Sequence, residues 1–395
     1  MPNITIEQQT LLNLLANNLF GYMNELPENI DFEKLLKESN LQAVTAIAVK
    51  NIHLPEQLKS DSLFLRLTVN SQVFSHHMML HEILTKAKIP YTVLKGAASA
   101  HYYPEPLFRT MGDVDFFVKK QDIPKAAEVL KQHGFQSFEE NHICHIIFRK
   151  GNIHLEMHFE PAGVPNGKAG DIVREYLENI VERSVSVKNE LCTFMNPDKF
   201  HHGLVMLLHM QHHLLSEGIG LRHLCDWAVF VNSFENNDFK KLFKEKLQNI
   251  GLWEFTKIIS LTAHVGIGLP YQEFMGKNTV LAKELLTDIL SGGNFGNKDS
   301  NRVNEGIFIS TRGKNGVARS RPVQMILSLN QIIYANWPIA KKIKLFLPCF
   351  WIVAIVRRLY RECTGKRKKT KLKTVYTNSK NRKTLYQQLH LFEIE

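Results

Sequence analysis

The sequence predicts an α+β protein in which a small mixed β-sheet lies between two helical regions. Three observations predict this class. Apolar residues recur at three- and four-residue spacing before residue 88 and again after residue 170, which is typical of amphipathic helices. Between these regions, short runs rich in β-branched and aromatic residues alternate with two helical runs. Hydrophobic residues make up 44% of the 395 residues, which is enough to form a sizeable core.

The predicted sheet is built from residues 88–162, with helices on one face. The run YTVLKG predicts a strand that ends in Gly96, and AASAHYY predicts a helix that PEP stops. DVDFFV predicts the next strand, and DIPKAAEVLKQHGF a helix that ends near Gly134. HIIFRK and NIHLEMHFE then form two strands around the turn at Gly151-Asn152.

The same pattern divides the whole chain into five segments. They are an N-terminal helical region (1–87), the sheet-containing core (88–165), a helical domain that completes the cleft (166–290), a loop with C-terminal helices (291–363) and a basic tail (364–395). We expect residues 364–385, which are basic and polar, to be mobile.

Cysteine usage and apolar patterning exclude several classes of protein. The five cysteines are scattered without a CxxC pair, which argues against a zinc ribbon or a disulfide framework. The longest apolar run, residues 345–356, has 12 residues, whereas a membrane-spanning helix needs about 20. The N-terminus lacks the basic start and apolar run of a signal peptide. We therefore expect a cytoplasmic protein without a transmembrane span.

Positive charge is concentrated at the C-terminal side. Residues 341–395 contain 15 Lys/Arg and 3 Glu, a net charge of +12, whereas the whole chain carries +11, so residues 1–340 sum to −1. Residues 337–361 also combine apolar residues with flanking Lys and Arg. This tail could lie on an anionic membrane surface as a peripheral contact, bind RNA phosphates, or pack as a terminal helix with a solvated basic end.

The chemistry is predicted by acidic residues around the second strand. Asp113 and Asp115 follow Gly112 and project to the same side, because strand residues alternate faces. Glu156, in the later strand NIHLEMHF, joins them if the two strands are neighbours. Two or three carboxylates held this close require a cation, and hard divalent cations prefer such oxygen ligands.

A phosphate-binding turn is predicted upstream. Lys95, Gly96 and Ala97 mark the passage from a strand into a helix, where free amides bind phosphates and a lysine adds positive charge. Arg109, four residues before Asp113, can reach the same anion.

Together these motifs resemble the polymerase-beta-like nucleotidyltransferase superfamily, and more closely a bacterial group of largely uncharacterised nucleotidyltransferases. The resemblance covers about residues 90–230 and is carried by an ordered set of motifs: Leu94-Lys95-Gly96, Tyr103-Pro104, Arg109, Gly112-Asp113-Val114-Asp115, Gly134-Phe135, Leu155-Glu156-Met157-His158, His209, Arg222 and Asp226. The superfamily usually has Gly-Ser at the phosphate turn, where this chain has Gly96-Ala97 with Ser99 nearby.

The resemblance implies a minimal nucleotidyltransferase fold and metal-dependent transfer of a nucleoside monophosphate from an NTP, such as ATP, with release of pyrophosphate. Asp113, Asp115 and Glu156 would be catalytic and hold Mg²⁺ or Mn²⁺. The nucleotide and its phosphates would be bound by the turn, the arginine and the glycine before the acidic pair: Lys95, Gly96, Ala97, Arg109 and Gly112. The alternatives are a non-catalytic nucleotide-binding or interaction protein on the same fold, and a protein that acts through its basic tail.

Histidines and one charged pair leave further alternatives open. His158 shares a strand face with Glu156, so it either flanks the acidic site or ligates a metal. His209 lies four residues from His213 on a predicted helix, where a metal hydrolase site is a weaker alternative to ordinary packing. Arg222 and Asp226 either form an internal ion pair or line the cleft.

Overall fold

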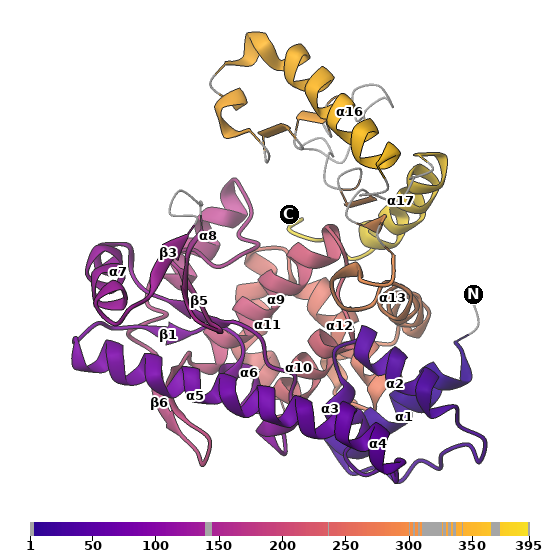
Figure 1. Ribbon diagram of the computed structural model, residues 1–395. Helices are drawn as coiled ribbons and strands as arrows, with labels where there is room; N and C mark the ends of the chain where they lie inside the picture. The colour runs from indigo at the N-terminus through magenta and orange to yellow at the C-terminus, as the bar shows by residue number, and fades with distance from the viewer. Residues whose placement is uncertain are drawn as a thin grey trace.

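The structure is a computed structural model that describes residues 4–138, 144–235, 237–299, scattered residues between 301 and 334, and residues 337–341, 343–364 and 372–393. It has the α+β architecture that the sequence predicts, with one mixed sheet among many helices (Figure 1). No helix of the described residues is both long enough and apolar enough to cross a membrane.

The N-terminal region is helical, as predicted. It contains α1 (Ile6–Phe20), α2 (Phe32–Leu41), α3 (Thr45–Val49), α4 (Glu56–Lys59) and α5 (Leu65–Lys86). Helix α1 begins at a capping box in which Thr5 and Gln8 satisfy each other's backbone amides. Helices α1 and α3 share a core with the later helices, whereas α5 runs alongside the sheet (Figure 1).

The sheet has five strands in the order β1-β2-β5-β4-β3. The strands are β1 (Thr92–Val93), β2 (Val114–Phe117), β3 (Gln136–Phe138), β4 (His145–Lys150) and β5 (Ile153–His158). Strands β2 and β5 are parallel, and the other pairs are antiparallel. The hairpin at Gly151 is confirmed, and the short strand β3 is an addition to the predicted set.

Alternation along β2 and β5 gives the sheet one apolar and one polar face. Val114, Phe116, Leu155 and Met157 are buried in a core that also holds residues of α5 and α7 (Ile123–Gln132). Asp115 and its neighbours on β5 therefore point to the opposite face. The candidate functional site lies on that polar face.

Residues 166–290 form a helical region with one exception. The helices are α8 (Lys168–Leu177), α9 (Lys199–Leu215), α10 (Leu221–Asn232), α11 (Asp238–Asn249), α12 (Trp253–Ile267) and α13 (Thr279–Gly292). A hairpin of β6 (Val185–Lys188) and β7 (Thr193–Asn196) interrupts them, so the expectation of helix throughout this region was wrong. Strand β7 lies beside β1 and α5, and the hairpin forms a two-stranded sheet of its own.

The C-terminal side contains α16 (Leu347–Cys363) and α17 (Leu372–Gln387). The expected mobility of residues 364–385 stays a prediction, and residues 365–371 lie outside the described part of the chain. Helix α17 packs on α13 (Figure 1). Arg382 is buried there and bonds the Glu305 carboxylate at 3.1 Å, while Tyr386 donates to Asp288 at 2.7 Å. Buried acids thus hold part of the basic tail on the body. The five-segment division of the chain stays a prediction.

Candidate functional site

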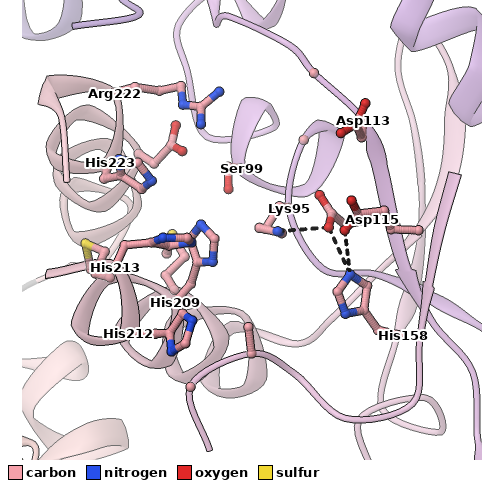
Figure 2. Close-up of a pocket in the computed structure, with 18 of the residues that line it drawn as sticks. Lys95, Ser99, Asp113, Asp115, His158, His209, His212, His213, Arg222 and His223 are labelled. Atoms are coloured by element: carbon pink, nitrogen blue, oxygen red, sulfur yellow. Dashed lines mark hydrogen bonds and ion pairs between the residues drawn. The ribbon is translucent and has the colours of Figure 1, made fainter. Parts of the chain in front are cut away.

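A cavity of about 640 Å³ lies between the polar face of the sheet and helices α9 and α10. Every predicted site residue except Ala97 lines it. Figure 2 shows Lys95, Asp113 and Asp115 on one side, and Arg222 with several imidazoles on the other. The predicted residues at its wall are Lys95, Gly96, Arg109, Gly112, Asp113, Asp115, Glu156, His158, His209, Arg222 and Asp226.

The two central carboxylates are brought together by strand pairing. Asp115 of β2 is the direct partner of Glu156 in parallel β5, so their side chains leave the same face of the sheet. Asp113 lies just before β2 and lines the same cavity. The expectation that these two strands are neighbours is therefore confirmed.

Asp115 is the most tightly held carboxylate of the site. Its Oδ1 lies 2.8 Å from Lys95 Nζ and 3.0 Å from His158 Nε2. Burial alone would raise the pKa of Asp115, but Lys95 and His158 outweigh burial and hold the pKa well below its ordinary value. The pKa of His158 is raised, because its hydrogen bonds to Asp115 and Glu156 outweigh its own burial. Asp115 is thus ionised and compensated.

Asp113 differs because it has little compensation. Burial, Glu156 and Asp115 raise its pKa, and only His154, with Nδ1 3.7 Å from Oδ1, and the more distant Lys95 oppose them. Its carboxylate is half exposed. Like charges that raise a neighbour's pKa mark a place where a cation is favourable.

The turn before α6 approaches the rest of the site closely. Gly96 has φ +61°, and a Cβ there would lie 3.0 Å from His77 Nε2, so both the conformation and the space favour glycine. Helix α6 covers only Ala97–Ala100, which is shorter than the predicted helix over 97–103. Its dipole is correspondingly small, so Lys95 supplies most of the positive charge of this turn.

Arg109 lies at the cavity wall, but its guanidinium is paired. Its Nε and Nη2 donate to the two oxygens of Asp226 at 2.9 and 2.7 Å, and Tyr103 donates to the same carboxylate at 2.8 Å. All three residues are buried. Arg109 therefore joins the segment before β2 to α10. Asp226 thus forms its ion pair with Arg109, and not with Arg222 as one of the two alternatives had it.

Arg222 is a third cationic residue at the cavity wall, beside Lys95 and Arg109. Its Nε is buried without a hydrogen-bond partner in the described part of the chain, and its guanidinium lies 5.3 Å from the ring centroid of Phe295. Burial and the proximity of Arg109 lower the pKa of Arg222. Such a cation is suited to an anionic group of a substrate.

Several imidazoles share with Arg222 the wall formed by α9 and α10 (Figure 2). The rings of His209 and His223 lie 5.5 Å apart, and both face Phe295. Burial lowers the pKa of His209 and of His223 well below the ordinary value, so both rings are neutral at pH 7. The predicted set contained His209 but not His223 or Phe295, whose proximity depends on how α9, α10 and the 293–296 loop pack.

A group of metal-ligating type also lies at the sheet. Ligand atoms of His145, Glu156 and His158 all lie within 4.8 Å of one another. Among the described residues, this group of three His, Cys, Asp or Glu side chains meets that distance. Asp113 and Asp115 line the same cavity outside this group. His145 was absent from the predicted set, although its place opposite His158 follows from the β4–β5 hairpin.

Comparison with known proteins identifies a family. A family model described as uncharacterised nucleotidyltransferase matches residues 28–265, which include the whole sheet, α9 and α10. No curated protein and no solved structure matches the chain.

Proposed function

The chain belongs to this family of uncharacterised nucleotidyltransferases, and from that premise we propose that it transfers a nucleoside monophosphate from an NTP to an acceptor hydroxyl or another nucleophile. In this reaction the acceptor oxygen bonds to the α-phosphorus, the bond to the bridging oxygen breaks, and pyrophosphate leaves. The observation that carries the proposal is the direct pairing of Asp115 with Glu156 at a cavity that Asp113 and Lys95 also line.

The residues present fit a divalent cation. Asp113, Asp115 and Glu156 offer carboxylate oxygens at the adjacent strands β2 and β5, and the pKa of Asp113 is raised first by burial and then by the charges of Glu156 and Asp115. Asp113 and Asp115 would hold the nucleotide metal, and Glu156 would complete a second position. When bound, Mg²⁺ or Mn²⁺ supplies neutralisation of the triphosphate charge.

Lys95 and the turn after it would hold the phosphates. The Lys95 ammonium lies 2.8 Å from Asp115, so it can exchange this carboxylate for a phosphate oxygen without leaving the site. The amides around Gly96 and Ala97 would add hydrogen bonds. Glu156 would accept the proton of the acceptor, and its contact with His158, 3.4 Å from Oε2, keeps the carboxylate oriented.

The opposite wall would bind the acceptor. Arg222 provides a positive charge, while neutral His209 and His223 provide donors and acceptors beside the ring of Phe295. Arg109 contributes by position, because its bonds to Asp226 fix the segment that leads to Asp113.

Nucleotide binding and acceptor labelling test the proposal in two steps. Calorimetry with Mg²⁺ and each NTP should show binding that Lys95→Ala weakens. Incubation of cell extract with an α-³²P-labelled NTP should then label an acceptor, and Asp115→Asn should abolish the label. NTP binding without labelling or pyrophosphate release across all extracts would favour a non-catalytic nucleotide-binding protein. No binding of any NTP would refute both.

Helix α16 supports a second part of the proposal, contact with an anionic membrane surface. Ile352, Val353, Ile355 and Val356 are exposed on it, and the helix lies apart from the body (Figure 1). Arg357, also exposed, follows directly. An apolar helix with flanking basic residues is attracted to anionic lipid.

Sedimentation with vesicles tests this contact. Full-length protein should bind vesicles that contain phosphatidylserine, and Ile352→Asp/Val356→Asp should bind several-fold less. Val280→Asp, at an exposed valine of α13, is the matched control. Equal binding by the α16 variant, or salt-sensitive retention of RNA in place of vesicles, would count against the membrane surface.

A further inference from the structure

Two histidines face each other across the β4–β5 hairpin. His145 and His158 are direct partners in the antiparallel ladder, and their ring centroids lie 5.1 Å apart. Glu156 is two residues from His158 and shares its face of the strand. The backbone itself therefore gathers two imidazoles and a carboxylate at one point of the cavity wall.

The distances among these three groups suit a metal ion. One ligand atom from each residue lies within 4.8 Å of the others, and His158 Nε2 lies 3.4 Å from Glu156 Oε2. Nitrogen and oxygen ligands bind Zn²⁺ at about 2.0–2.2 Å, so ligand atoms around one such ion are separated by roughly 3–3.5 Å. Small side-chain movements would bring the group to that geometry.

An unsatisfied nitrogen is a separate indication of a ligand. His158 is only 3% exposed, yet its Nδ1 has no hydrogen-bond partner among the described residues. Buried polar atoms are nearly always paired, and an unpaired one often marks the place of an absent ion or water. This nitrogen is therefore available to an ion, while Nε2 keeps its contacts with Asp115 and Glu156.

We infer that His145, Glu156 and His158 bind a divalent transition-metal ion of the Mn²⁺-to-Zn²⁺ series rather than Mg²⁺. Imidazole nitrogen suits these ions, whereas Mg²⁺ takes oxygen ligands almost exclusively. Three protein ligands leave coordination positions open, as in catalytic rather than structural sites. The inference rests on the proposed function in one respect, namely that Glu156 serves the second metal position.

The two metal positions would then differ in chemistry. Asp113 and Asp115 offer oxygen alone, which suits the ion that accompanies the nucleotide phosphates. Coordination at the second position through the unpaired Nδ1 of His158 would leave in place its Nε2 contact with Asp115 and the contact of Asp115 with Lys95. The site would therefore require a nitrogen-ligated ion in addition to the nucleotide metal.

Spectroscopy of the full-length protein tests this assignment directly. Pulsed electron paramagnetic resonance of bound Mn²⁺ should show ¹⁴N coupling from imidazole, and Co²⁺ should develop visible d–d absorption on titration. We expect His145→Gln to remove part of the ¹⁴N coupling and to weaken Co²⁺ binding by at least about tenfold. Glu156→Gln should also weaken Co²⁺ binding. His212→Gln, at the opposite wall of the same cavity, should change neither measurement.

Circular dichroism of each variant establishes that it is folded. Absence of ¹⁴N coupling in the wild-type protein, or unchanged Co²⁺ affinity in folded His145→Gln, would overturn the inference. Calorimetry with Mg²⁺ and ATP on the same preparations separates it from the proposed function. Imidazole-ligated Mn²⁺ without ATP binding would support the metal assignment and refute nucleotidyl transfer. ATP binding without ¹⁴N coupling would refute the metal assignment and leave nucleotidyl transfer supported.

Discussion

Arg109 and Asp226 are joined by two hydrogen bonds of 2.9 and 2.7 Å, although 117 residues separate them in the sequence. The pair is buried, so each charge depends on the other for compensation. It ties the segment that precedes the acidic strand to α10, the helix that carries Arg222. The pair thereby fixes the position of one cavity wall relative to the other.

We expect Asp226→Asn to lower the free energy of unfolding by about 3 kcal/mol, because it leaves the Arg109 charge buried without its partner. Urea denaturation measures this loss. Asp238→Asn, which removes an exposed ion pair with Lys241, should cost less than about 0.5 kcal/mol. Equal effects of the two substitutions would mean that the buried pair contributes no more than a surface pair.

Asp113→Asn should separate activity from stability. We expect the proposed transfer to fall by at least about a hundredfold, because the proposed metal ligand loses its charge. The thermal midpoint without metal should rise slightly, since the raised pKa of Asp113 means that its ionised form is disfavoured in the folded protein at pH 7. Differential scanning fluorimetry with and without Mn²⁺ measures both effects. A lower midpoint without metal would contradict the electrostatic argument.

Gly96→Ala should destabilise the protein by about 1–2 kcal/mol and weaken NTP binding. The substitution places a Cβ at positive φ, 3.0 Å from His77 Nε2. Gly112→Ala is the matched control for the effect on stability, because a Cβ there meets nothing within 4 Å at the same cavity. Chemical denaturation and calorimetry with ATP measure the two effects, and indistinguishable variants would show that the turn tolerates a side chain.

Arg382→Gln should lower the free energy of unfolding by about 3 kcal/mol, because Glu305 loses its buried partner. Lys380→Gln, at an exposed position of the same helix, should leave stability unchanged. Removal of residues 364–395 should be at least as damaging as Arg382→Gln. A fully stable truncated protein would mean that α17 rests on the body without supporting it.

Buried histidines should make the protein sensitive to acid. Burial lowers the pKa of His202 to about 3, so the folded protein keeps this ring neutral while the unfolded chain protonates it near pH 6.5. Its contribution to stability is present above about pH 6.5 and is lost as the pH falls toward 3. His202→Phe should reduce the pH dependence of unfolding free energy between pH 6 and 4 by as much as about 1.4 kcal/mol per pH unit.

Urea denaturation at several pH values measures that dependence. Gln132→Ala, at an exposed residue of α7 that does not titrate, should leave it unchanged. If His202→Phe and the wild-type protein lose stability in parallel on acidification, the ring is protonated in the folded protein and the assigned neutral state is wrong.

The sheet and its carboxylates could be predicted because their signals are local. Alternation in DVDFFV and NIHLEMHF specifies which side chains share a face, and the turn at Gly151 specifies the hairpin. The adjacency of β2 and β5, which brings Asp115 beside Glu156, was a conditional expectation that the structure confirms.

The remaining features depend on contacts distant in sequence. The four-residue strands β6 and β7 are too short to stand out among helical runs. Helix α17 lacks an apolar stripe. It is held by hydrogen bonds from Arg382 and Tyr386 to acidic residues that lie 77 and 98 residues away. Such distant contacts leave no pattern in a single sequence. The same holds for His223 and Phe295, which meet only after α10 and the 293–296 loop have packed.

The buried bond between Glu305 and Arg382 also bears on how the chain is synthesised. The ribosome synthesises Glu305 before Arg382, so during translation the Glu305 carboxylate has no Arg382 to pair with. The C-terminal end of α9 and helix α13 likewise lack their contacts with α17 until that helix has been made. A nascent chain would therefore show chaperone dependence and protease sensitivity around residues 288–305 until residue 382 has emerged. Translational pausing before that point would prolong the vulnerable interval.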